Sequence, residues 1–242
     1  MTADLRQLWQ EAFEDSGETL DKFAATGFCP DRCHYLCDGA IPVSALYWFD
    51  CELEGQKLAY IYAVATLKSH RGRGLAQRLI RETHEILQAQ GYAGGILVPS
   101  SGLFPFYEKI GYKTVAKIDE FVCQAGGEPV AFREIDTEEY ARLRRTYLPA
   151  GGVVQEGAAL DWLHTYTKFY AGKDFLFSAA ADGTHLLVQE FLGDTTLAGG
   201  ILTALGMATG RFRTPGTGLD FAMYFPFTDT CPVPGYFGLA LD

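Results

Sequence analysis

The sequence predicts a mixed α/β protein with a partly antiparallel sheet in residues 1–125, followed by a second, smaller α+β domain in residues 126–242. Three observations lead to this prediction. Residues 32–67 have the composition of strands and contain two turn signals, Asp38-Gly39 and Glu54-Gly55-Gln56, which is typical of an antiparallel meander. The meander leads into a basic turn and an amphipathic helix. A small, flexible segment, residues 125–129, then separates the two halves.

The first domain is expected to begin with two amphipathic helices in residues 4–27, because apolar side chains recur there every three or four positions and Ser16 can cap the second helix. After the meander, a helix over residues 75–90 ends at Gly91. A buried strand follows at 93–98, then a helix at 103–110 and closing strands at 112–122. This order predicts helices on a mixed sheet.

The second domain repeats this order loosely. Asp182-Gly183 predicts a hairpin, and Asp194 or Thr195 is a plausible cap for a helix that ends at Gly206. The other expected elements are a strand at 130–133, helices at 137–147 and 158–170, hairpin strands at 175–180 and 185–192, and a strand at 219–225.

Composition excludes several classes of protein. The chain has 242 residues, 48% of them hydrophobic, which indicates a folded protein with packed cores. A net charge of −10 argues against a nucleic-acid partner and suits solubility or a cationic substrate. The first residues lack the features of a secretory signal, and no apolar run approaches the roughly 20 residues of a membrane helix. We therefore expect a cytoplasmic protein that does not associate with membranes.

The six cysteines are then expected to be reduced. Cys29, Cys33 and Cys37, with His34 among them, suggest a metal site at first. Their spacing matches no zinc pattern in full, and no second pair of ligands lies nearby in the sequence. Buried thiols are the better interpretation, and no metal is predicted.

The turn between the strand at 58–67 and the helix at 75–90 has unusual charge. A helix N-terminus carries partial positive charge and normally attracts acidic or capping side chains. This one carries Lys68, Arg71 and Arg73 instead. A bound anion would resolve the conflict, and Gly72 and Gly74 would let it approach the backbone. The turn is therefore predicted to bind phosphate.

Two common phosphate-binding motifs fail at this turn. A Walker loop needs Lys and then Ser or Thr around the last glycine, and a Rossmann fingerprint needs a small residue where Gln77 stands. The pattern Arg71-x-x-Gly74-x-Ala76 instead resembles the acetyl-CoA signature of the GNAT acetyltransferases. A second passage, residues 102–112 with the sequence GLFPFYEKIGY, is similar to a further segment of that family at the expected distance.

The pairing of this unit with a second domain also resembles the Eis-like GNAT proteins, in which an active GNAT domain precedes a degenerate one and a sterol-carrier-like domain. The residues after Gly127 suffice for the second of these domains and not for the third. The resemblance thus implies a GNAT acetyltransferase domain followed by a degenerate GNAT-like accessory domain. In the second part, residues 211–216 contain two arginines but lack the helix pattern that should follow a cofactor turn.

The resemblance also implies roles for individual residues. The backbone of Val64, Ala65 and Thr66 would pair with the pantetheine arm of acetyl-CoA, and Tyr107 would donate a proton to the departing thiolate. In Eis-like enzymes the terminal carboxylate serves as the base, which makes Asp242 a candidate. The pyrophosphate would be wrapped by Arg71, Gly72, Arg73, Gly74, Leu75 and Ala76.

Other polar and aromatic residues have simpler interpretations. His84 is expected on the surface of its helix, and Asp50, Glu52 and Glu54 on a solvated strand end. Two further sets remain open between core and acceptor pocket: Trp48 with Phe49, and Tyr60 with Tyr62.

We therefore predict an acyltransferase, a GNAT N-acetyltransferase that moves acetyl from acetyl-CoA to a small-molecule amine by direct attack. The alternative is a CoA-binding sensor or interaction module with little turnover. The sequence specifies neither the acceptor nor the oligomeric state, so a homo-oligomer stays open.

Overall fold

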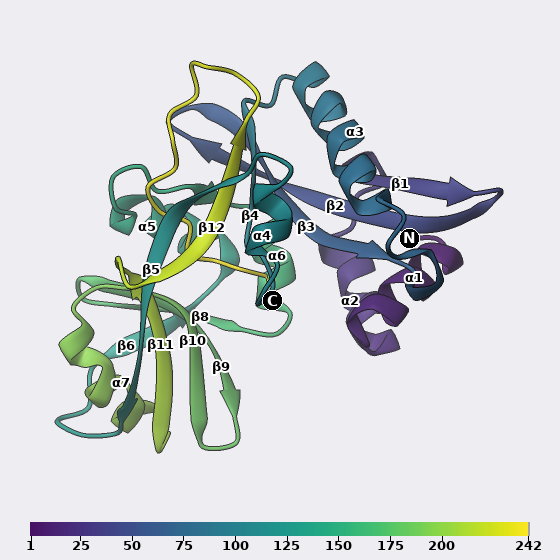
Figure 1. Cartoon of the computed structure of the whole chain (residues 1–242). Coiled ribbons are helices and arrows are strands. Elements are labelled where there is room, and N and C mark those ends of the chain that lie inside the picture. Colours follow the sequence, from purple (N-terminus) through teal and green to yellow (C-terminus); the bar gives the residue numbers. More distant parts are fainter. Residues whose placement is uncertain (242) are drawn as a thin grey trace. The chain divides into compact units, whose positions relative to one another are not determined.

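The computed structural model describes residues 1–241 and forms two compact units (Figure 1). Unit 1 comprises Met1–Lys113 and Met223–Pro232, and unit 2 comprises residues 114–222 and 233–241. Each unit is thus built from two separate stretches of chain.

The elements of unit 1 follow the predicted order of helices, three strands, helix, strand and helix. They are α1 (Ala3–Phe13), α2 (Gly17–Thr26), η1 (Pro30–Arg32), β1 (Cys33–Asp38), β2 (Ile41–Leu53), β3 (Gln56–Thr66), η2 (Lys68–His70), α3 (Leu75–Ala89), β4 (Gly94–Leu97) and α4 (Phe104–Glu108). The N-terminal caps follow the sequence: the side chains of Thr2 and Ser16 accept hydrogen bonds from the first turns of α1 and α2.

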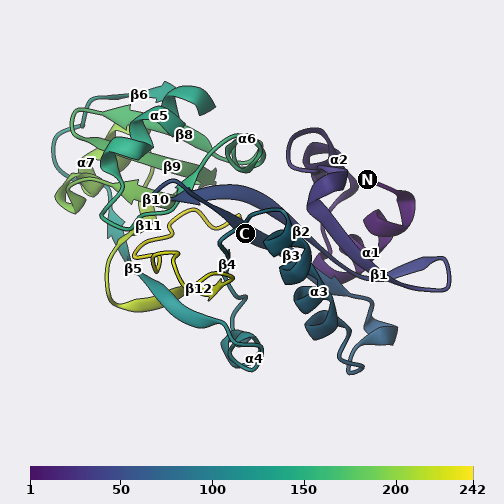
Figure 2. The same ribbon diagram turned by 90° about the horizontal axis from the view of Figure 1, so that it is seen from above.

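Helices cover both faces of the unit 1 sheet, in which β1, β2 and β3 are antiparallel and β4 runs parallel to β3 (Figures 1 and 2). On one face, Leu79, Ile80 and Leu87 of α3 pack with Trp48 and Ile61. On the other face lie α1 and α2, whose aromatic side chains meet those of the strands: Trp9 and Phe23 contact Tyr47 and Tyr62. The alternation of side chains along β2 and β3 creates these two cores.

Unit 2 contains the remaining strands and helices. They are β5 (Lys113–Gln124), β6 (Phe132–Ile135), α5 (Thr137–Tyr147), β7 (Val154–Gln155), α6 (Ala158–His164), β8 (Lys168–Gly172), β9 (Phe175–Asp182), β10 (His185–Leu192), η3 (Thr195–Leu197), α7 (Ala198–Leu205), β11 (Thr209–Pro215) and the first half of β12 (Leu219–Pro226). Its strands are ordered β5-β11-β10-β9-β8-β6.

The structure divides the chain differently from the predicted boundary at residue 125. Strand β5, which was expected to close the first domain, pairs with β11 in unit 2 from Ile118 to Gln124. The place beside β4 in unit 1 is taken by the second half of β12, about 125 residues later in the chain, where Met223 pairs with Leu97. Strand pairing between such distant segments leaves no local signal in the sequence.

Two local predictions in unit 2 were wrong. The helix expected over residues 158–170 ends at His164, and β8 follows because Lys168–Gly172 finds partners in both β6 and β9. Strand β11 was missed, since Arg211 is exposed while Phe212, Arg213 and Thr214 are all buried, which gives no regular alternation. The predicted hairpin of β9 and β10 is confirmed.

The two units share a substructure. In unit 1, β3 and β4 are parallel and joined by α3; in unit 2, β10 and β11 are parallel and joined by α7. In both, the first of the parallel strands carries a register shift against its antiparallel neighbour, next to Ala63 in β3 and next to Glu190 in β10. By position, the counterpart of the basic turn in unit 2 is therefore the segment between Leu192 and Ala198, a correspondence that the sequence did not reveal.

Candidate active site

Unit 1 contains a cavity of about 670 Å³ at the end of β3. Most of the residues predicted to bind the cofactor line it, together with Tyr107. The lining residues are Ala12, Phe13, Val64, Ala65, Thr66, His70, Arg71, Gly72, Gly74, Leu75, Ala76, Gln77, Leu103, Phe106 and Tyr107.

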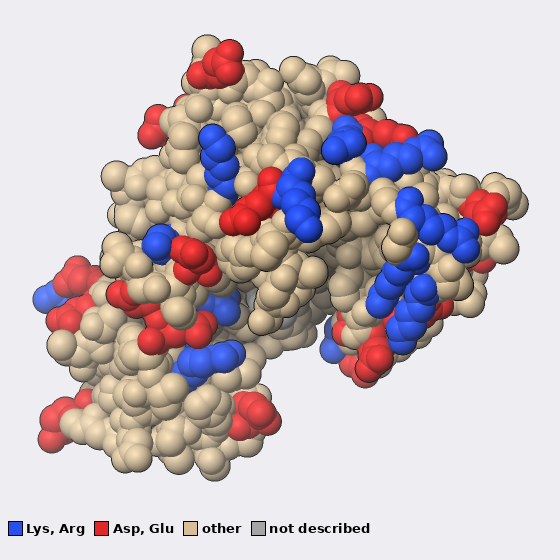
Figure 3. Space-filling model, in the orientation of Figure 1, with Lys and Arg blue, Asp and Glu red and all other residues tan. Residues whose placement is uncertain are grey.

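One wall of the cavity is the basic turn. Gly72 and Gly74 have φ angles of +76° and +75°, which side chains rarely adopt, and a Cβ atom at either position would meet nothing within 4 Å. The two glycines are therefore needed for the backbone conformation of the turn, and without side chains they leave the backbone N–H groups of the turn uncovered. Figure 3 shows Lys and Arg side chains gathered at the right of the view, where this turn of unit 1 lies.

Helix α3 begins at this wall without a cap. Gly74 provides no side-chain hydrogen bond to its first turn, and that turn contains no acidic residue. By contrast, α1, α2 and α5 are capped by Thr2, Ser16 and Asp136. The open N–H groups and the helix dipole make this end of α3 attractive to an anion.

The two arginines of the turn fold against backbone carbonyl groups. Arg71 donates from Nε to the carbonyl of Thr66 at 3.0 Å, and Arg73 donates from Nη2 to the carbonyl of Ser69 at 3.3 Å. Arg71 lines the cavity, whereas Arg73 lies outside its lining. The Nε contact orients the guanidinium of Arg71 and leaves its terminal nitrogens for a ligand.

A second wall is the free end of β3. Pairing with β4 extends only from Leu58 to Tyr60, while β3 continues to Thr66 with β2 as its neighbour on the other side. Ala63 lies at the register shift with φ of +49°, an unusual conformation for a residue with a side chain. Beyond this bulge, Val64, Ala65 and Thr66 follow the cavity wall, with one backbone edge that no strand covers.

Tyr107 comes from α4 and closes the cavity from a third side. It is 7% exposed, its ring packs edge-to-face with those of Phe106 and Tyr112, and burial raises the pKa of its hydroxyl to about 12. The hydroxyl is therefore neutral throughout the physiological range and can act as a hydrogen-bond donor.

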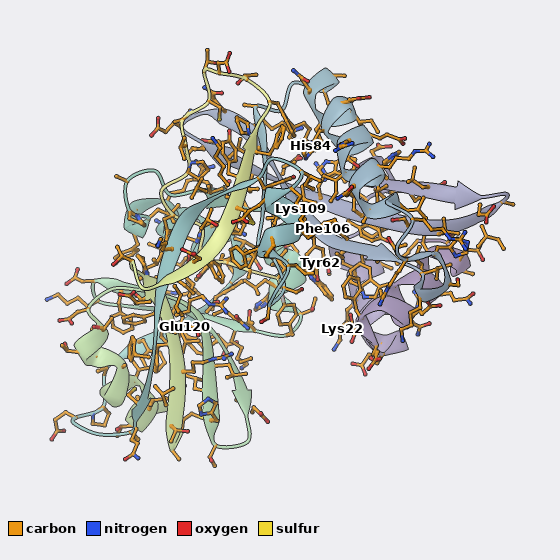
Figure 4. All side chains as sticks on the ribbon, in the orientation of Figure 1. Lys22, Tyr62, His84, Phe106, Lys109 and Glu120 are labelled. Carbon is orange, nitrogen blue, oxygen red and sulfur yellow. The ribbon has the colours of Figure 1, made fainter. Side chains whose placement is uncertain are left out.

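Four other residues that line the cavity were not predicted as site residues. Ala12 and Phe13 come from the end of α1, and Leu103 and Phe106 from the start of α4. Figure 4 labels Phe106 on α4. Phe13 and Leu103 are 41% and 44% exposed, which suits side chains that line an open cavity. Ala12 and Phe13 are far from the turn in sequence and outside both family-like segments, whereas Leu103 and Phe106 lie in the second of them, where only Tyr107 had been given a role.

The acidic and aromatic candidates lie elsewhere in unit 1. Asp50 is held by Arg32 at 2.6 Å and Lys57 at 3.7 Å and does not line the cavity. Phe49 and Tyr60 are 2% and 3% exposed and belong to the core around Trp9 and Phe23. Asp242 lies outside the described residues.

The described residues 1–241 contain no group of three or more His, Cys, Asp or Glu side chains placed to hold a metal ion. Among the helices of the same residues, none is long and apolar enough to cross a membrane.

His84 is buried, and its predicted surface position was wrong. It is 9% exposed, lies among the rings of Tyr112, Phe225 and Phe227, and its Nε2 is 2.7 Å from the Tyr112 hydroxyl (Figure 4). Burial lowers the pKa of His84 to about 4, since a charged imidazole would lose its hydration. It is therefore neutral at physiological pH.

This burial predicts a pH dependence of stability. Below pH 6.5 the unfolded chain gains a proton at His84 that the folded protein takes up only near pH 4. The contribution of neutral His84 to the free energy of unfolding is thus complete above pH 6.5. It is lost as the pH falls toward 4, by up to about 3 kcal/mol. Urea unfolding at pH 7 and pH 4.5 should show a smaller loss for His84→Gln than for wild type; equal losses would contradict the assignment.

The sequence of unit 1 matches a known family. Residues 2–115 fit the family model for an acetyltransferase (GNAT) domain. The chain carries a GNAT acetyltransferase domain. The prediction of this enzyme family from the turn and the α4 segment is confirmed. A comparison with curated proteins finds no match.

Solved structures extend the similarity of fold beyond this GNAT domain. A GCN5-related N-acetyltransferase from Kribbella flavida matches with a TM-score of 0.69 and 19% identity, over 91% of this chain and 67% of that one. One from Anabaena variabilis gives 0.70 and 14%, over 93% and 70%. Eis1 from Mycobacterium abscessus gives 0.66 and 12%, over 91% and 70%. The predicted fold class, a mixed GNAT-type sheet, is confirmed.

Proposed function

We propose that the GNAT domain transfers an acetyl group from acetyl-CoA to a primary amine by direct attack. The observation that carries the proposal is the cavity in which the uncapped start of α3, the free edge of β3 and the Tyr107 hydroxyl meet. Each of these three features has a separate task in the reaction.

The turn would hold the pyrophosphate of the donor. Its free N–H groups and the positive end of α3 favour a dianion, and Arg71 adds a guanidinium already oriented by Thr66. The binding residues we propose are those predicted from the sequence, Arg71 to Ala76, with Gln77 added because it lines the same wall.

The free edge of β3 would hold the pantetheine arm. The arm contains amide groups, and Val64, Ala65 and Thr66 present backbone donors and acceptors along one side of the cavity. The bulge at Ala63 shifts the register between β3 and β2, and beyond it Ala65 and Thr66 pair with Ala45 and Ser44 of β2. Binding would therefore resemble the addition of a short strand to the sheet.

Tyr107 would assist the departure of sulfur. Acetyl-CoA supplies the thioester; the amine nitrogen forms a bond to its carbonyl carbon, and the carbon–sulfur bond breaks. Since a thiol has a pKa of about 8.5 and Tyr107 one of about 12, the hydroxyl stays protonated and donates to the thiolate as it develops. The proton that the amine releases then restores the Tyr107 hydroxyl, so that the net products are the amide and the free thiol of CoA.

The amine must lose its own proton before it attacks. No carboxylate lines the cavity among residues 1–241, and the imidazole of His70 is engaged by Ser69 Oγ at 2.8 Å and Asp38 at 3.3 Å. Asp242 therefore stays our proposed base, on the resemblance to Eis-like enzymes alone.

We propose that unit 2 is a degenerate GNAT-like accessory domain that binds no CoA. In its counterpart of the basic turn, Asp194 accepts from the Thr196 backbone N–H at 2.9 Å and from its hydroxyl at 2.7 Å. A carboxylate thus caps η3, the short helix that leads into α7, and places negative charge where an anion would otherwise bind. Farther along, Thr214 donates to the carbonyl of Phe191 and links β11 to β10.

Calorimetric titration with CoA, compared with ATP and NAD, tests the binding part of the proposal. We expect one CoA per chain and a higher melting temperature, with no comparable effect of the other nucleotides. Thiol release from acetyl-CoA with a panel of primary amines then tests turnover. Binding without thiol release would favour the sensor or interaction module, and two CoA per chain would contradict the proposal for unit 2.

A further inference from the structure

The backbone N–H groups of the basic turn fall into two sets. Those at its start are taken by the protein: Leu67 donates to Val43, His70 to Leu67 and Arg71 to Lys68, each to a carbonyl group. From residue 72 to residue 77, no described residue accepts from the backbone. The first set anchors the turn, and the second is available to a ligand.

One anchor differs from the others in its origin. The N–H of Lys68 donates to the side-chain carboxylate of Glu11 on α1, across 57 positions of sequence. The N–H groups of Leu67, His70 and Arg71 instead donate to backbone carbonyls of β2 or of the turn itself. The position of the turn thus depends on a side chain from a helix that precedes the whole sheet.

Packing supports the same connection between α1 and the turn. Leu8 and Ala12 of α1 belong to a cluster with Ala65 at the end of β3 and with Leu67. The next residue of the helix, Phe13, lines the cavity together with Ala12. Glu11 is therefore flanked by contacts that bring the end of α1 against both β3 and the turn.

The charge of Glu11 makes this contact notable. A carboxylate near a phosphate site opposes anion binding unless it has another task. Here the carboxylate accepts a hydrogen bond from the backbone N–H of Lys68, for which no backbone carbonyl among the described residues serves as acceptor. Glu11 does not line the cavity, so it is not placed to contact the ligand.

We propose that Glu11 is a positioning residue for CoA binding: its carboxylate fixes the start of the turn and so aims the N–H groups of residues 72–77 into the cavity. This inference rests on the proposed binding of CoA at the turn. It adds α1, which carries none of the family motifs, to the determinants of cofactor affinity.

Two variants separate the hydrogen bond from the charge. Glu11→Gln and Glu11→Ala remove the same negative charge, but only Gln keeps an oxygen that can accept from Lys68. We expect Glu11→Ala to weaken CoA binding about five- to tenfold in calorimetric titration, and Glu11→Gln to stay within about twofold of wild type. Glu14→Gln is the matched control, because it removes an exposed charge three residues farther on.

The outcomes distinguish this inference from the function on which it rests. If wild type binds CoA and Glu11→Ala binds it equally well, the inference is overturned and the proposed function stands. If CoA binding is weakened equally in both Glu11 variants, the effect comes from the lost charge, and the inference is also overturned. If wild type binds no CoA, the proposed function fails and the inference with it. Without CoA, the melting temperatures of wild type and the three variants should agree within about 2 °C. Weaker CoA binding can then not be explained by partial unfolding of a variant.

Discussion

Tyr107→Phe is expected to lower kcat about 100-fold and to leave the affinity for CoA within about twofold. The substitution removes only the hydroxyl, whose proposed task begins when the carbon–sulfur bond breaks, so the loss belongs to the transition state rather than to binding. Burial raises the pKa of this hydroxyl to about 12, and wild-type kcat should therefore not decline through its ionisation between pH 7 and pH 9. Thiol release and CoA titration measure the two quantities.

Tyr112→Phe is the control for this substitution. Its ring centroid lies 5.7 Å from that of Tyr107, and its hydroxyl meets His84 and not the cavity. Loss of that hydroxyl should lower the free energy of unfolding by about 1 kcal/mol and leave kcat nearly unchanged. A Tyr107→Phe enzyme with wild-type kcat would remove Tyr107 from the mechanism, whereas a loss of CoA affinity alone would make it a binding residue.

Arg144→Leu is expected to cost about 3–5 kcal/mol of the free energy of unfolding. Arg144 and Glu190 are 1% and 0% exposed at their side chains, and Arg144 donates to Glu190 from Nε at 2.7 Å and from Nη2 at 2.9 Å. Burial opposes the charge of Arg144, but the carboxylate outweighs it and raises the pKa of the guanidinium. Without Arg144, the partners of Glu190 among the described residues 1–241 are two tyrosine hydroxyls, those of Tyr140 and Tyr236.

Urea unfolding followed by circular dichroism tests this expectation, because the loss should appear as a lower midpoint at an unchanged slope. Arg145→Leu is the matched control. Arg145 is the next residue of α5, but its side chain is 44% exposed and pairs with Glu156 at the surface, so its loss should cost less than about 1 kcal/mol. Similar midpoints for the two variants would show that the buried pair does not stabilise unit 2.

The same pair supports the proposal that unit 2 is a GNAT-like domain that binds no CoA. Glu190 follows the register shift of β10, where unit 1 has the bulge beside the cavity. In unit 2 the side chain after this shift is buried with Arg144, Tyr140 and Tyr236. Protein groups thus occupy positions that correspond to the cavity wall of unit 1. The sequence indicated no counterpart of the basic turn in the second half, because the parallel pairing of β10 with β11 cannot be read from either strand alone.

Local chemistry explains which predictions succeeded. The cap at Ser16, the hairpin after Asp38 and the glycines of the basic turn depend on residues a few positions apart, and all are present in the structure. The helix expected over residues 158–170 failed for the opposite reason. Residues 168–172 form β8 because they pair with the neighbouring strands β6 and β9. This tertiary pairing outweighs the weak local preference of these residues for a helix.

The sequence by itself determined the family of residues 2–115 and led to the prediction of an anion at the turn, because a basic, glycine-containing segment before a helix has few physical solutions. Only the tertiary structure decided that His84 is buried, that α1 supplies Glu11 to the turn, and that β12 completes the sheet of unit 1. These features join residues that are 28 or more positions apart in the chain. Their energies come from burial and pairing between distant segments, which exist only once the chain has folded.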